Sequence, residues 1–126
     1  MIINDVLYHF LIDAIKLGDI NKVKNFINAG VDISADDCLA LCTASEYGDF
    51  KIVKELLNAG ADVHAWDDSS LLLAVEYGNL KTVKELLKAG ANVHTYNNLP
   101  LRIAANKGNR KIVELLKNWS KEHDKE

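Results

Sequence analysis

Residues 39–64 read LALCTASEYGDFKIVKELLNAGADVH, and this stretch decides the fold. Its first part places Leu41, Ala44 and Ser45 at three- and four-residue spacing, which is typical of one face of a helix. Gly48 follows, and a glycine tolerates the left-handed backbone that ends many helices. The spacing predicts a helix over residues 39–47 that stops at this glycine.

A second helix is predicted directly after the first. Asp49 is a favourable N-cap residue, and the chain reaches the next glycine at Gly60. Between them lie the apolar residues of an amphipathic helix, Ile52, Val53, Leu56 and Leu57. The stretch therefore encodes two short helices joined by a tight turn.

The same unit recurs every 30 residues along the chain. The repeated columns are Gly18, Gly48, Gly78 and Gly108; Ala14, Ala44, Ala74 and Ala104; Leu11, Leu41, Leu71 and Leu101; and Val23, Val53, Val83 and Val113. Asp or Asn follows each glycine of the first column, as Asp19, Asp49, Asn79 and Asn109. Units of this size share a core only by stacking, so we expect one domain over residues 1–126. Its repeats cover residues 5–34, 35–64, 65–94 and 95–120, with a polar and frayed tail at 121–126.

Three segments carry a family resemblance: Leu99–Ala105 (LPLRIAA), Ile52–Leu57 (IVKELL) and Gly60–His64 (GADVH). They resemble the ankyrin repeat, whose consensus has T-P-L-H-x-A-A, I-V-x-x-L-L and G-A-D-V-N. The resemblance implies an all-α solenoid of four helix-turn-helix repeats that binds other proteins and has no catalytic activity. The usual period is 33, and the three missing residues precede the first helix, so short tight turns should replace the β-hairpin fingers.

The sequence differs from the ankyrin consensus in places, and its repeat length is similar to that of one group of ankyrin proteins. The Thr and His of T-P-L-H are replaced in Leu39–Cys42 and Ser69–Leu72, so their hydrogen bonds must be replaced or lost. Arrays with a 30-residue period are similar to those of giant DNA viruses and some intracellular bacteria. This likeness implies a host-cell protein as partner.

The composition of the chain argues against several classes of protein. The 126 residues carry a net charge of -3, which gives no overall reason to bind nucleic acid or an anionic membrane. Two cysteines, Cys38 and Cys42, are too few for a disulfide framework. We interpret both as small buried hydrophobes with free thiols, and expect a cytoplasmic, intracellular protein in a reducing compartment.

No set of residues predicts catalysis, a cofactor or a metal site. His64 and His94 stand at the asparagine position of G-A-D-V-N, where a side chain ties the turn to adjacent backbone. That family position is also hydroxylated in some ankyrin proteins, and whether either histidine is modified stays open. Metal ligation with the cysteines fits neither spacing nor ligand number.

The surface used for recognition in the family holds the candidate partner-binding residues. They lie at the finger tips and at the ends of the first helices: Asp36, Asp37, Trp66, Asp67, Asp68, Tyr96, Asn97 and Asn98, and Glu46, Tyr47, Glu76, Tyr77 and Lys107. Together they predict an acidic strip with aromatic anchors, which would bind a protein with a basic segment. The lysines of the second helices alternate with glutamates and are interpreted as a solvated face.

The alternative function is structural. Apolar residues at the two ends of the solenoid, Ile2, Ile3, Val6 and Trp119, would let the chain associate end to end. A monomer that binds a partner protein remains the first expectation.

Overall fold

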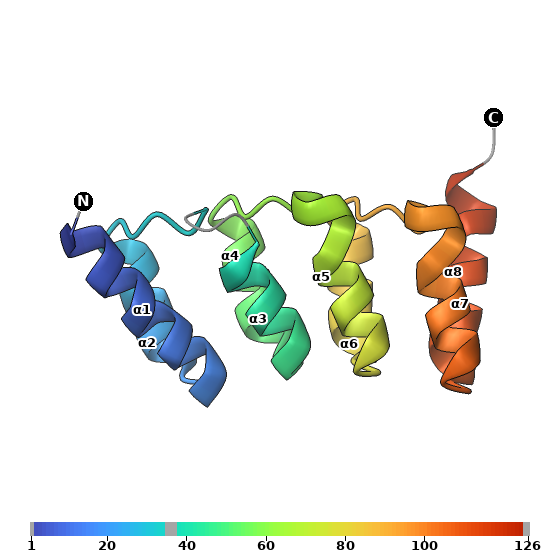
Figure 1. Cartoon of the computed structure of the whole chain (residues 1–126), viewed down its shortest axis with the longest axis horizontal. Coiled ribbons are helices and arrows are strands. Elements are labelled where there is room, and N and C mark those ends of the chain that lie inside the picture. Colours follow the sequence, from blue (N-terminus) through green and yellow to red (C-terminus); the bar gives the residue numbers. More distant parts are fainter. Residues whose placement is uncertain (1, 35–37, 125–126) are drawn as a thin grey trace.

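The structure, a computed structural model, describes residues 2–34 and 38–124, and side chains from residue 5 onward. All regular structure in these residues is helical. The helices are α1 (Ile2–Leu17), α2 (Ile20–Asn28), α3 (Leu39–Tyr47), α4 (Phe50–Asn58), α5 (Ala65–Glu76), α6 (Leu80–Lys88), α7 (Thr95–Asn106) and α8 (Arg110–His123). They form successive antiparallel hairpins that stack side by side along one axis (Figure 1). The predicted all-α solenoid of helix-turn-helix repeats is confirmed.

Each hairpin turns at its glycine. Gly48 caps α3 with a left-handed backbone (φ 79°), and its N–H donates to the Ala44 carbonyl. Asp49 then caps α4, because its side chain accepts from the N–H groups of Lys51 and Ile52. The predicted boundaries of the first helix, residues 39–47, are those of α3.

Asn79 departs from the predicted capping pattern. Asp19 and Asn109 accept from a backbone N–H three residues on, but the Asn79 side chain makes no such bond. Its amide instead donates to the Ser45 carbonyl of the preceding hairpin at 2.9 Å. A residue expected to cap its own helix therefore joins two repeats.

The core is continuous along the stack. Side chains of the alanine column are buried, with Ala44, Ala74 and Ala104 fully enclosed, and so are Val23, Val53 and Val83. The first helices α1, α3, α5 and α7 lie on one side of this core and the second helices on the other (Figure 1). Small alanine side chains let successive first helices approach closely, as the repeat pattern predicted.

The C-terminal end differs from the predicted frayed tail. Ser120 takes the place of the glycine that ends earlier second helices, and α8 continues through Lys121 to His123. Trp119 stacks on His123 with ring centroids 3.9 Å apart. Without a glycine to favour a left-handed stop, the helix has no local signal to end at residue 120.

Candidate functional site

Two turns with an unusual backbone lead into α5 and α7. Trp66, Asp67 and Asp68 have φ values of 54°, 53° and 62°, and the equivalent Tyr96, Asn97 and Asn98 have values of 49°, 55° and 62°. Residues other than glycine rarely adopt this left-handed backbone conformation, and its energetic cost is largest for residues with bulky side chains. The short turns expected in place of β-hairpins are therefore present, and they hold Trp66 and Tyr96 at their tips. Observed backbone strain of this kind supports a functional role.

A hydrogen-bonded clasp closes the first of these turns. The His64 ring Nδ1 lies 3.0 Å from the Asp68 carboxylate, and the Asn92 backbone N–H donates to the same Asp68 oxygen at 2.9 Å. Asp68 is only 5% exposed, so the expectation that it faces a partner on the surface strip is wrong. Its carboxylate is needed inside the protein, where it joins one turn to the next.

The second turn has a similar clasp with a different partner. One ring nitrogen of His94 faces the Asn98 side-chain oxygen and the other faces the Asp124 carboxylate. Hydrogen bonds that His94 donates to Asn98 first, and then to Asp124, raise the pKa of His94. The hydrogen bond from Ser120, and then that from His94, lowers the pKa of Asp124. The histidines thus tie their turns mainly through side chains, where the sequence suggested adjacent backbone.

The tips of the two turns are linked to each other. The Tyr96 hydroxyl donates to the Asp67 carboxylate at 2.8 Å, and the Thr95 hydroxyl donates to the Asp67 carbonyl at 3.0 Å. The first of these bonds raises the pKa of the Tyr96 phenol. Trp66 is 64% exposed and Tyr96 57% exposed, so both rings stay accessible. These residues form the tip row, which we define as Trp66, Asp67, Tyr96, Asn97 and Asn98. Asp36 and Asp37 lie outside the described residues.

The ends of the first helices form a second row. This helix-end row consists of Glu46, Tyr47, Glu76, Tyr77 and Lys107, all exposed at the surface. Lys107 forms an ion pair with Glu76 at 3.2 Å across two hairpins. Glu46 is the other carboxylate of this row, and it forms no ion pair within the described residues.

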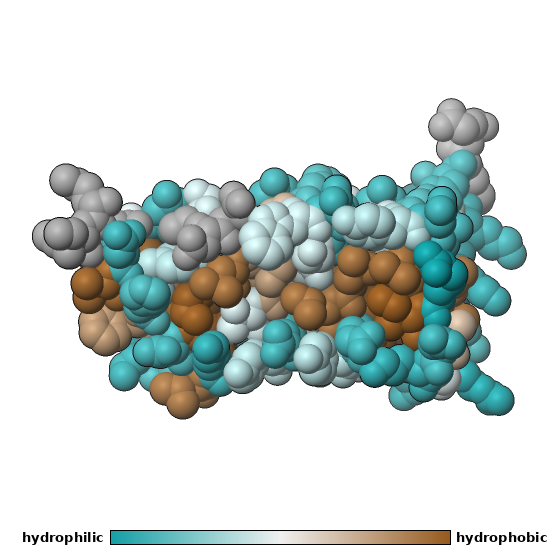
Figure 2. Space-filling view, in the orientation of Figure 1, coloured by the Kyte–Doolittle hydropathy of each residue, from teal (hydrophilic) through white to brown (hydrophobic). Residues whose placement is uncertain are grey.

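The two rows lie at opposite ends of the first helices, so the predicted strip is not one continuous patch. A nine-residue helix such as α3 is about 13 Å long, and this length separates the rows. An apolar band fills the space between them over α3, α5 and α7 (Figure 2). Leu39 is 41% exposed, and the first helices also carry the half-exposed Leu72, Leu73 and Leu99.

This apolar band was not predicted as part of the binding surface. Its signal was present in the sequence, because leucines stand where polar T-P-L-H residues are expected at Leu39 and Leu72. The two rows and the band together make a face with an apolar centre and a polar edge. That distribution is typical of protein interfaces.

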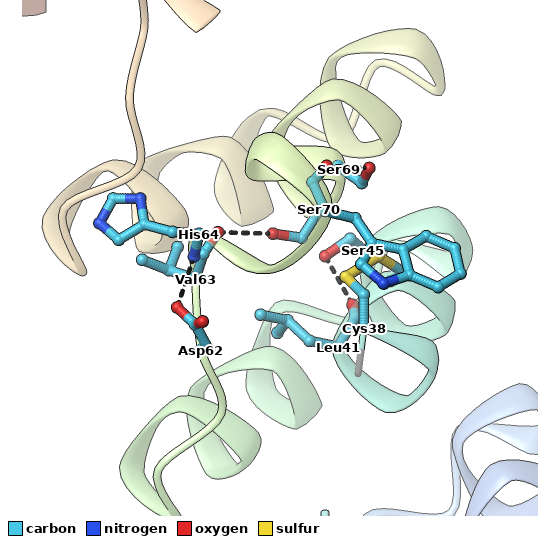
Figure 3. Close-up of a disulfide and its surroundings, with 10 residues drawn as sticks. Cys38, Leu41, Ser45, Asp62, Val63, His64, Ser69 and Ser70 are labelled. Carbon is cyan, nitrogen blue, oxygen red and sulfur yellow. Dashed lines mark hydrogen bonds between the residues drawn. A yellow bond between two sulfur atoms is a disulfide. The ribbon is translucent and has the colours of Figure 1, made fainter. Parts of the chain in front are cut away.

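The cysteines overturn another expectation. Cys38 and Cys42 are joined by a disulfide at the start of α3, so the prediction of two free thiols is wrong (Figure 3). Four-residue spacing places two side chains on the same face of a helix, one turn apart. The sequence signal was therefore available, and reasoning from the number of cysteines alone missed it.

Other kinds of site have little support in the described residues. Within residues 2–34 and 38–124, no cluster of three His, Cys, Asp or Glu side chains is arranged to hold a metal ion. In the same segments no helix combines the length and apolarity needed to cross a membrane.

Comparison with known proteins identifies the family. The family model described as ankyrin repeats, in three copies, matches residues 41–126. No curated protein sequence matches the chain. Ankyrin repeats are generally protein-protein interaction modules and typically have no catalytic activity. The match covers more than half of the chain and coincides with the hairpins from α3 onward, and the chain belongs to the ankyrin repeat family.

Proposed function

We propose that the chain binds a partner protein through the face formed by the tip row, the apolar band and the helix-end row. The observation that carries this proposal is the presentation of Trp66 and Tyr96 on strained left-handed turns, each more than half exposed. Exposed tryptophan and tyrosine are favoured anchors in interfaces, because they bury large areas at low entropic cost.

The partner offers apolar side chains next to lysine or arginine. Its apolar residues cover the band at Leu39, while its basic residues face Glu46 and Asp67. Arg102 donates to the Tyr96 and Asn97 carbonyls and so adds positive charge at the fourth repeat. We therefore centre the binding face on the second and third repeats, where Trp66, Tyr47 and Tyr77 lie. A host-cell protein as partner is part of this proposal and rests on the resemblance in repeat length.

The test uses peptides selected from a random library on the wild-type protein, with their affinity then measured for single variants. Trp66→Ala should weaken binding about 30-fold, equivalent to about 2 kcal/mol, while leaving helicity unchanged. Phe10→Ala is the matched control, because Phe10 is a similarly exposed aromatic residue (54%) at the N-terminal end. Unchanged affinity in Trp66→Ala would refute the assignment of this face.

The alternative function has its own supporting observation. Val6, Phe10 and Leu17 are exposed on α1, with Leu17 79% accessible, and Phe10 and Leu17 line a hollow of about 370 Å³ at the N-terminal end. Such a surface could drive association end to end. Mass that grows with protein concentration in the wild type but not in Leu17→Glu would favour this function. The side chains of Ile2 and Ile3 lie outside the described part of the structure.

A further inference from the structure

Cys38 differs in chemistry from the residue at the same place in the third repeat. The equivalent residue in the third repeat is Asp68, whose carboxylate holds His64 and the Asn92 N–H of the next finger. Cys38 is equally buried, at 1% exposure, but its sulfur is bonded to Cys42 one turn further along α3. A covalent bond thus stands where the third repeat uses hydrogen bonds.

The disulfide lies at the start of α3, on the side near Ser69 and Ser70 of α5 (Figure 3). Figure 3 shows Leu41 and Ser45 of α3 near it, together with Ser69 and Ser70 from the following repeat. Ser70 is fully buried there, with its hydroxyl 3.5 Å from the Val63 carbonyl. The neighbouring Ser69 hydroxyl donates to the Trp66 carbonyl at 2.6 Å. Any change in the packing around Cys38 therefore reaches the backbone of the Trp66 turn through one or two side chains.

We propose that Cys38–Cys42 is a thiol-exchange site, open to an external dithiol at Cys42, and that its oxidation state controls how Trp66 is presented. Only the role of Trp66 in binding rests on the proposed function. The thiol-exchange site is inferred from the disulfide, from the exposure of Cys42 and from the residues that surround the two sulfur atoms.

The chemistry of exchange follows from the positions of the two sulfur atoms. Cys42 is half-buried and can be approached, whereas Cys38 is enclosed. A thiolate of the dithiol attacks Cys42 Sγ, the S–S bond breaks, and Cys38 leaves as a thiolate that then takes up a proton. The second thiol of the reagent displaces Cys42, which gives two protein thiols and one reagent disulfide. Cys38 occupies the N-cap of α3, where the positive end of the helix dipole stabilises the departing thiolate.

Reduction also changes the packing. Two separate sulfur atoms occupy more space than a bonded pair, and interiors have little room to spare. Because Cys38 is enclosed, this change falls on its neighbours, among them Leu41 and Ser70. The Trp66 turn, already in a strained backbone conformation, is the adjoining segment with the least tolerance for such a shift.

The experiment uses the full chain with Trp119→Phe, so that Trp66 is the single fluorescent tryptophan. The protein is equilibrated in buffers of oxidised and reduced dithiothreitol, thiols are counted by maleimide labelling and mass, and Trp66 emission and amide exchange are recorded. We expect no labelling in the oxidised form and two labels in the reduced form. Emission should change between them, and amide exchange at residues 66–70 should become about tenfold faster on reduction.

A matched variant, Cys38→Ala with Cys42→Ala in the same background, keeps the array and removes the bridge. It should not respond to dithiothreitol. Two labels in fully oxidising buffer would overturn the exchange site, and a bridge that forms without changing Trp66 emission or exchange would overturn the control of Trp66. These readouts need no partner, so a failure of the proposed function, seen as unchanged peptide affinity in Trp66→Ala, is distinguishable from a failure here.

Discussion

The third and fourth repeats begin with the same backbone conformation, but their side chains form hydrogen bonds with different partners. Both begin with a left-handed turn, and in both a histidine bonds the residue four positions on. In the third repeat, Asp68 also accepts from Asn92 in the next repeat. In the fourth, His94 contacts Asp124, the C-cap residue of the extended helix α8, instead. Two repeats with the same backbone conformation are therefore held by different partners, which depend on the neighbour that each repeat meets.

The hairpin glycines show the same difference between interior and end. A Cβ built at Gly48 would lie 2.7 Å from the Asn79 side chain, whereas one at Gly108 would meet no atom of the described residues within 4 Å. Both glycines have a left-handed backbone, with φ of 79° and 70°. Comparing substitutions at the two positions therefore separates the cost of the local turn from the cost of the contact between repeats.

The largest effect is expected for Gly48→Ala. Positive φ should cost alanine about 1 kcal/mol at either glycine. At Gly48 the methyl group also displaces the Asn79 amide from the Ser45 carbonyl, which adds about 1–2 kcal/mol. Urea unfolding should show a loss of about 2–3 kcal/mol for Gly48→Ala and about 1 kcal/mol for Gly108→Ala. Equal losses would mean that the contact with Asn79 contributes nothing.

An intermediate effect is expected for Asp68→Ala. The substitution removes a buried acceptor and leaves the Asn92 N–H and the His64 ring without their partner, which should cost about 2 kcal/mol. Asn98→Ala, at the exposed equivalent position, should cost about 0.5 kcal/mol. Both values can be measured by thermal and urea unfolding, with Asp68→Asn as a control that keeps an acceptor. Should Asn98→Ala prove the more harmful, the distinction between interior and end would be wrong.

The smallest effect concerns pH and the end of the array. Both ring nitrogens of His94 face acceptors, so the bonded cluster is best satisfied by the protonated ring. Because the pKa of His94 is raised, its contribution to stability is fully present below the ordinary histidine value and is lost as the pH rises through the raised value. Because the pKa of Asp124 is lowered, the contribution of the carboxylate is lost only as the pH falls through that lowered value.

The difference in melting temperature between wild type and Asp124→Asn should therefore be largest at about pH 5 and shrink as the pH rises above the ordinary histidine value. Amide exchange in α8 beyond Trp119 reports whether the end of the helix separates from the array as the difference in melting temperature becomes smaller. A difference in melting temperature that stays constant over this pH range would exclude titration of His94 as its cause.

The sequence was sufficient for the hairpins and insufficient for the contacts between them. Gly48 followed by Asp49 stops one helix and starts the next through local backbone preferences, so the bounds of α3 could be read directly. Asp and Asn tolerate a left-handed backbone, which gave some signal at Asp67 and Asn97. Nothing in the local sequence predicts the same conformation for Trp66, because the cost is met by contacts with the rest of the array.

The partner-binding surface was predictable in composition but not in geometry. The exposure of Trp66 and Tyr47 follows from their places in the repeat, and the structure agrees. The burial of Asp68 depends on the approach of the next finger, which is a tertiary event. The separation of the tip and helix-end rows likewise depends on how the helices are oriented in the stack.

The contacts along the stack also bear on how the chain folds. The main contacts join the helices of one hairpin or the equivalent helices of successive hairpins, such as α3 with α5 and α5 with α7. Their partners are separated by about one repeat in sequence, so little loop entropy is lost before a contact forms. Folding of this chain can begin at any adjacent pair of hairpins and spread along the array, with a rate set by the best pair and not by the length of the whole.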